Sequence, residues 1–153
     1  MTLSQKENTL LQDLKSHEQL CVEKYSKYAS DATSCQLKNL FSHLSSIEQQ
    51  HLNTINQIIG GTVPQTSAGN SQQQNSSSAQ MLKADYTAES KQKDQYLCQD
   101  ALSTEKHVSS VYDTCIFEFK DPNLRNALNH IQKEEQQHGE QIYSFMAQNG
   151  MYS

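Results

Sequence analysis

An internal repeat constrains the fold of this chain more than any other feature of its sequence. When the sequence is slid over itself by 87 positions, residues 8–60 align without a gap with residues 95–147. Several of the positions that are identical in the two copies are polar or ionisable, so a shared preference for helix explains them poorly. We therefore interpret the chain as a tandem duplication. The fourteen identical positions, each with its counterpart 87 residues later, are Leu10, Gln12, Asp13, Ser16, Glu18, Tyr25, Leu37, Asn39, His43, Glu48, Gln49, Gln50, His51 and Ile55.

The spacing of apolar residues predicts that both copies are helical. Apolar residues recur at three- and four-residue intervals, as on the buried face of an amphipathic helix. We expect four helices, at about residues 4–31, 35–59, 88–118 and 122–148. Asp121 followed by Pro122 is typical of a helix start, and Gly60 and Gly150 are typical of helix ends. The predicted fold class is all-α.

Residues 61–80 separate the two copies and consist mainly of Gly, Ser, Gln and Asn. One interpretation is a flexible linker between two independent helical hairpins. A single hairpin would leave its apolar stripe without a partner, however, so we favour one domain over residues 1–153. That domain would be an antiparallel four-helix bundle with one long crossover between the second and third helices. Twenty extended residues reach about 65 Å, which exceeds the length of about 40 Å expected for these helices.

Composition excludes several classes of partner. The formal net charge of −5 and the scattered lysines leave no basic stripe for nucleic acid. No apolar run approaches the roughly 18–20 residues of a membrane span, and the first residues lack the apolar segment of a signal peptide. We therefore expect a soluble protein made in the cytoplasm. The four cysteines have no C-x-x-C spacing, which predicts reduced and mostly buried helix residues: Cys21, Cys35, Cys98 and Cys115.

Each copy carries a Glu-x-x-His pair and a lone glutamate 30 residues before the glutamate of that pair. Residues three apart share a helix face, and residues equidistant from the turn of a hairpin lie side by side. The midpoints fall at residues 33 and 120, inside the two expected turns. Two such hairpins around a pseudo-two-fold axis would gather four carboxylates and two imidazoles at one level. The six residues are Glu18, Glu48, His51, Glu105, Glu135 and His138.

Four carboxylates and two imidazoles are the ligands that a dinuclear metal centre requires. Without metal, buried carboxylates would repel one another or take up protons. A single Glu-x-x-His would be read as a solvated surface pair, but two copies in register favour a metal centre. Glu23, Glu134 and Glu140 lack acidic counterparts in the other copy, and we expect them to be surface charges.

Tyr25 and Tyr112 lie seven residues after the lone glutamates, on nearly the same helix face. Helical side chains lean toward the N-terminus, so both rings should point back toward the carboxylates. Either they fill the core, or their hydroxyls also hydrogen-bond the ligating carboxylates and orient them.

The six residues resemble, ligand for ligand, the pattern of the ferritin-like di-iron carboxylate proteins, and Tyr25 and Tyr112 resemble tyrosines of bacterioferritin-type sites. Over residues 83–153 the chain also resembles the Coat F domain of spore coat proteins from spore-forming Firmicutes. This second resemblance rests on Glu105, Tyr112 and the segments FEFKDPNLR, EEQQH and MAQNGMY.

The resemblance implies a ferritin-like fold that holds two iron or manganese ions. Glu18 and Glu105 would bind terminally, whereas Glu48 and Glu135 would bridge the ions. It also implies sporulation and a place in the spore coat after synthesis in the cytoplasm, with other coat proteins or a second copy of this chain as partners.

Two functions remain open at this point. The metal could brace a structural coat component, or it could serve an enzyme acting on peroxide or dioxygen, as in rubrerythrin-like and manganese-catalase-like proteins. Six protein ligands on two metals leave open positions, which favours chemistry. The lack of rubredoxin-like cysteine pairs argues against turnover, and the lack of a clear fifth helix argues against an iron-storage shell. We expect a spore-coat protein with a dinuclear site.

Overall fold

The computed structural model describes residues 2–65 and 82–152, which form four α-helices and no strands. The predicted all-α class and the four predicted helices are confirmed, with boundaries that agree to within one residue. No helix in these two segments has the length and apolarity needed to cross a membrane. The helices are α1 (Gln5–Asp31), α2 (Cys35–Ile59), α3 (Ala88–Glu118) and α4 (Pro122–Gln148).

Each helix begins at a side chain that caps its free backbone N–H groups. Ser4 and Thr87 form capping boxes at the starts of α1 and α3. The Ser34 hydroxyl accepts a hydrogen bond from the backbone N–H of Leu37 at the start of α2. Asp121 caps α4 directly before its proline, as the sequence predicts. The four helix starts are therefore set by local sequence.

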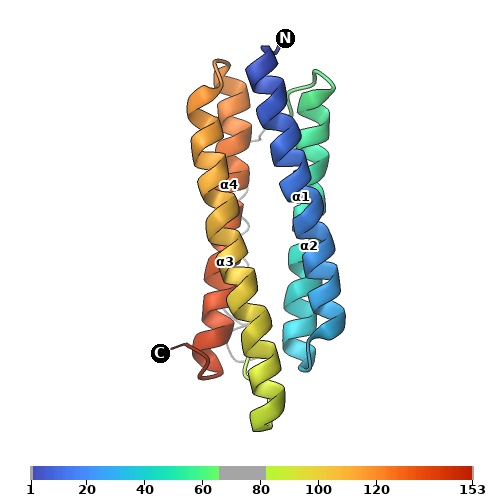
Figure 1. Cartoon of the computed structure of the whole chain (residues 1–153), viewed down its shortest axis with the longest axis vertical. Coiled ribbons are helices and arrows are strands. Elements are labelled where there is room, and N and C mark those ends of the chain that lie inside the picture. Colours follow the sequence, from blue (N-terminus) through green and yellow to red (C-terminus); the bar gives the residue numbers. More distant parts are fainter. Residues whose placement is uncertain (1, 66–81, 153) are drawn as a thin grey trace.

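The helices pack as two antiparallel hairpins laid against each other (Figure 1). The first hairpin is α1 with α2 and the second is α3 with α4; α1 lies beside α3, and α2 lies beside α4. The end of α2 and the start of α3 lie at opposite ends of the bundle, as a long crossover would require. Residues 66–80 of the predicted crossover lie outside the described residues, so the assignment of residues 1–153 to one domain stays a prediction.

The interior of the bundle contains two apolar clusters. One cluster lies near the N-terminal end of α1 and includes Leu11, Ile58 and Leu128. The other lies toward the opposite end and includes Phe41 and Phe145. Buried glutamates and histidines occupy the interior between the two clusters. Three of the four cysteines are buried, as the sequence predicts, and Cys35 is exposed.

Two buried carboxylates hold the hairpins together near opposite ends of the bundle. Asp94 of α3 accepts hydrogen bonds from the backbone N–H groups of Thr33 and Ser34, in the turn of the first hairpin, at 2.7 and 3.1 Å. Glu7 of α1 accepts one from the backbone N–H of Lys120, in the turn of the second hairpin, at 3.2 Å. Asp94 lies 87 positions after Glu7, and Lys120 lies 87 positions after Thr33. The three-dimensional structure thus keeps the repeat beyond the aligned residues.

Candidate metal centre

The structure brings together all six residues that the repeat singled out. α1 and α3 each contribute one glutamate, and α2 and α4 each contribute a Glu-x-x-His pair. All six side chains are buried between the two hairpins, none more than 3% exposed. We call this set the carboxylate–histidine layer. Its members are Glu18, Glu48, His51, Glu105, Glu135 and His138.

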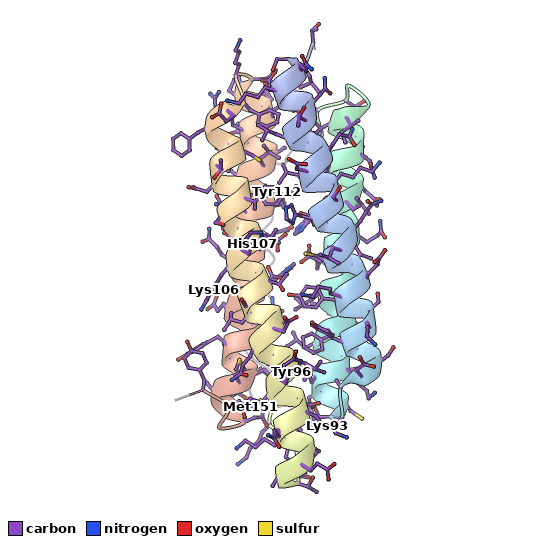
Figure 2. The ribbon with its side chains drawn as sticks, in the orientation of Figure 1. Lys93, Tyr96, Lys106, His107, Tyr112 and Met151 are labelled. Carbon is purple, nitrogen blue, oxygen red and sulfur yellow. The ribbon has the colours of Figure 1, made fainter. Side chains whose placement is uncertain are left out.

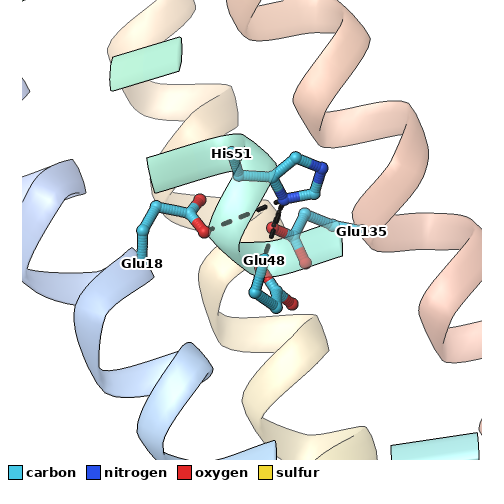
Figure 3. A group of neighbouring side chains, drawn as sticks. All are labelled: Glu18, Glu48, His51 and Glu135. Carbon is cyan, nitrogen blue, oxygen red and sulfur yellow. Dashed lines mark hydrogen bonds and ion pairs between the residues drawn. The ribbon is translucent and has the colours of Figure 1, made fainter. Parts of the chain in front are cut away.

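The layer contains two overlapping groups of potential metal ligands. In each group, one nitrogen or oxygen atom of every residue lies within 4.8 Å of those of the other three. Glu48 and Glu135 belong to both groups. One group adds Glu18 and His51 (Figure 3), and the other adds Glu105 and His138. The two halves of the layer are therefore joined by two shared carboxylates.

His51 directs one ring nitrogen at the carboxylates of the layer. Its Nδ1 lies 3.1 Å from Glu135 Oε1, 3.2 Å from Glu48 Oε2 and 3.8 Å from Glu18 Oε2 (Figure 3). Its other nitrogen, Nε2, lies 2.6 Å from Glu134 Oε2. A ligating histidine commonly bonds such a carboxylate through its second nitrogen, which fixes the orientation of the ring.

His138 occupies the corresponding place in the second copy. Its Nδ1 lies 3.1 Å from Glu48 Oε1, 3.5 Å from Glu135 Oε2 and 3.6 Å from Glu105 Oε1. The rings of His138 and His51 are nearly parallel, with centroids 5.7 Å apart. Both histidines thus point the same atom, Nδ1, at the shared carboxylates.

Two tyrosines bind the layer from neighbouring turns of α1 and α3. The Tyr25 hydroxyl donates a hydrogen bond to Glu105 Oε1, and the Tyr112 hydroxyl donates one to Glu18 Oε1. Each tyrosine therefore reaches from its own hairpin to the lone glutamate of the other. Both tyrosines are at most 2% exposed, so they fill the core. Their hydroxyls also orient the two carboxylates that they bond. Tyr112 is labelled on α3 in Figure 2.

Among the residues that the structure describes, three oxygens of the ionised carboxylates in the layer have no hydrogen-bond partner: Glu18 Oε2, Glu105 Oε2 and Glu135 Oε2. Leaving a buried polar atom unpaired costs about 1–3 kcal/mol, and more when the group is charged. A cation is a more favourable neighbour for such carboxylate oxygens than an apolar side chain is. The donor set and its unpaired oxygens therefore fit a metal ion.

Burial alters the protonation of the layer. Burial, together with the nearby Glu135 and Glu48, raises the pKa of Glu18 well above its usual value. Burial also raises the pKa of Glu105 to about 7. Burial opposes a charged imidazolium, yet hydrogen bonds with the surrounding glutamates raise the pKa of His138 to about 11. The residues therefore share protons among themselves, and divalent cations would replace those protons on binding.

Glu134 corrects one prediction made from the sequence. It was expected to be a surface charge because its counterpart in the first copy is Ile47, whereas its side chain is only 30% exposed and contacts His51. A comparison of the two copies could not find this residue, because it breaks their symmetry. Glu23 and Glu140 are exposed, as expected.

Comparison with known proteins gives one match, and it lies in the second copy. Residues 93–153, which cover most of α3 and all of α4, match the family model of the Coat F domain. This supports the predicted Coat F resemblance over slightly fewer residues than the 83–153 expected. The match includes Glu105, Glu135 and His138 of the layer, and the other three members precede it. No curated protein and no solved structure matches the chain.

Proposed function

We propose that this chain is a spore-coat-associated ferritin-like protein that binds two iron or manganese ions in the carboxylate–histidine layer. The single observation that carries the proposal is the set of three buried carboxylate oxygens without hydrogen-bond partners. A mixed set of carboxylates and imidazoles suits iron and manganese, whereas zinc and copper favour sites richer in nitrogen or sulfur.

The overlap of the two ligand groups supports a role for each residue. Glu48 and Glu135 belong to both groups and would bridge the two ions. Glu18 and Glu105 each belong to one group and would bind terminally, held by the tyrosine hydroxyls. His51 and His138 would each supply Nδ1 to one ion.

The Coat F match and the order of the helices supply the biological context of the proposal. The match suggests association with the spore coat, where other coat proteins or a second copy of this chain would be the partners. The directions of the four helices support the proposal, because a ferritin-like bundle with one crossover would have the same directions. In this setting the bound metal would brace the bundle, because its ligands come from all four helices.

Metal analysis tests the proposal. Protein purified without chelator should contain about two iron or manganese ions per chain, as expected for a dinuclear site. Glu18→Ala should lower the metal content, because it removes a ligand from one group. The matched control is Glu23→Ala on the same helix, where the side chain is exposed and the content should not change. Equal metal contents in both variants would contradict the assignment of Glu18.

A second candidate function is an enzyme that acts on peroxide or dioxygen. It is favoured by the ligand count, since two ions that share six residues keep positions open for a small molecule. Two ions held by these six residues would supply two-electron exchange with one such molecule. Fe(II) added to metal-free protein under air should then oxidise faster than in buffer, or manganese-loaded protein should release oxygen from peroxide. If the loaded protein does neither, only the bracing role remains.

A further inference from the structure

A groove on the outer side of the second hairpin runs between α3 and α4 and reaches the carboxylate–histidine layer. It has a volume of about 650 Å³, and Glu105 and Glu135 form part of its lining. Lys106 lies on its wall and is labelled on the outer side of α3 in Figure 2. The six side chains of the layer are at most 3% exposed, and the groove brings solvent up to two of them, Glu105 and Glu135.

Gly139 shapes this groove. It lies inside α4, directly after His138, where a glycine costs about 0.5–1 kcal/mol relative to alanine. Its φ angle is not positive, so the backbone does not require glycine. A Cβ atom there would lie 3.7 Å from Leu102 Cδ1, which is an ordinary contact, so helix packing does not require it either. What the glycine provides is open space in the groove.

The first hairpin carries a larger residue at the corresponding place. The counterpart of Gly139 is Leu52 of α2, whose side chain is only 9% exposed. The counterpart of Ser109, another lining residue, is Val22 of α1. The two copies thus hold equivalent ligands, but only the second replaces leucine by glycine beside its histidine.

The charge of the groove favours cations. Its lining includes four carboxylates and one lysine, together with serine, glutamine and tyrosine side chains. The carboxylates of Asp113 and Glu140 lie outside the layer, on the exposed part of the groove. A cleft lined mainly by one sign of charge concentrates ions of the opposite sign.

We propose that this groove is the route by which hydrated divalent cations reach the carboxylate–histidine layer. This inference rests on the proposed function, because it assumes that the layer binds metal. Cations collect at Asp113 and Glu140, pass the gap at Gly139 and arrive at Glu105 and Glu135. Cations can therefore reach the half of the layer that contains His138 directly from solvent, and the two hairpins do not have to separate.

Uptake of Co²⁺ by metal-free protein, followed by stopped-flow absorbance, tests the route. Gly139→Leu should slow uptake by at least about tenfold, because binding must then wait for the bundle to open. The final amount of Co²⁺ bound and the helix content should stay unchanged. Gly139→Ala is the matched control; its methyl group leaves the groove open, and uptake should stay within about twofold of wild type.

A second pair of substitutions tests the charge without changing the space. Asp113→Asn combined with Glu140→Gln should slow uptake at low salt and weaken its dependence on salt, with the amount bound unchanged. If Gly139→Leu and the double variant both take up Co²⁺ at the wild-type rate, the route is wrong while the metal site stands. If the wild-type protein takes up no Co²⁺, the route and the proposed function fail together.

Discussion

At the scale of single residues, the site depends on groups that hold the carboxylates in place as much as on the carboxylates themselves. The Tyr112 hydroxyl donates a hydrogen bond to one oxygen of Glu18, whose other oxygen has no partner among the described residues. Tyr25 does the same for Glu105. Each lone glutamate is therefore held with one oxygen turned into the layer, and the two hairpins hold each other's ligands.

Tyr112→Phe should weaken metal binding with no change in helix content. The loss of a group that orients a ligand typically costs about 10–100-fold in affinity. The measurement is competition with a chelator of known affinity, and the matched control is Tyr96→Phe on the same helix, where the side chain is 69% exposed. If both variants bind metal as tightly as wild type, the Tyr112 hydroxyl does not position Glu18.

At the scale of the elements, each helix begins at its own cap, and the pairing of the hairpins relies on carboxylates buried against turns. Asp94 is fully buried and also accepts a hydrogen bond from the Tyr86 hydroxyl at 2.6 Å. It therefore joins the second turn of α3 to the turn between α1 and α2. Glu7 does the equivalent for α1 and the turn between α3 and α4.

Asp94→Ala should lower the free energy of unfolding by about 3 kcal/mol. The substitution leaves the backbone N–H groups of Thr33 and Ser34 without their partner, and an unsatisfied buried donor costs about 1–3 kcal/mol. The measurement is urea denaturation followed by circular dichroism. Asp85→Ala replaces an exposed aspartate nearby and should change stability by less than about 0.5 kcal/mol. A similar small effect at Asp94 would show that it does not hold the hairpins together.

At the scale of the whole molecule, the repeat made most of the fold predictable. It placed four helices, two turns and six ligand candidates, because identical polar residues at one offset must occupy equivalent places. The repeat could not predict the features in which the two copies differ. The contact of Glu134 with His51 and the groove at Gly139 have no counterpart in the other copy, and the equivalent positions 7 and 94 carry different residues, Glu7 and Asp94. These features depend on packing between helices, which periodicity in one sequence does not report.

Metal-free protein should lose stability as the pH rises. The pKa of Glu105 is about 7 against an ordinary 4.5, and that of His138, which faces Glu48, Glu105 and Glu135, is about 11 against 6.5. Both residues keep protons that the unfolded chain releases. The stabilising contribution of Glu105 is complete below pH 4.5 and is lost as the pH rises toward about 7. The contribution of His138 is complete below pH 6.5 and is lost as the pH rises toward about 11.

The urea midpoint of metal-free protein should therefore fall between about pH 6 and pH 9. Metal-loaded protein should lose less over the same range, because metal binding has already displaced these protons and stabilises the folded state by mass action. A midpoint that rises with pH in the metal-free protein would contradict this assignment of protons.

The central claim is that the carboxylate–histidine layer holds two metal ions. Anomalous scattering at the iron and manganese edges, from crystals of protein purified without chelator, tests it most directly. We expect two peaks about 3.5–4 Å apart, both in contact with Glu48 and Glu135, one next to His51 and the other next to His138. The claim is contradicted if the layer of fully folded protein stays metal-free after equilibration with iron and manganese. It is also contradicted if peaks appear only at exposed histidines such as His107.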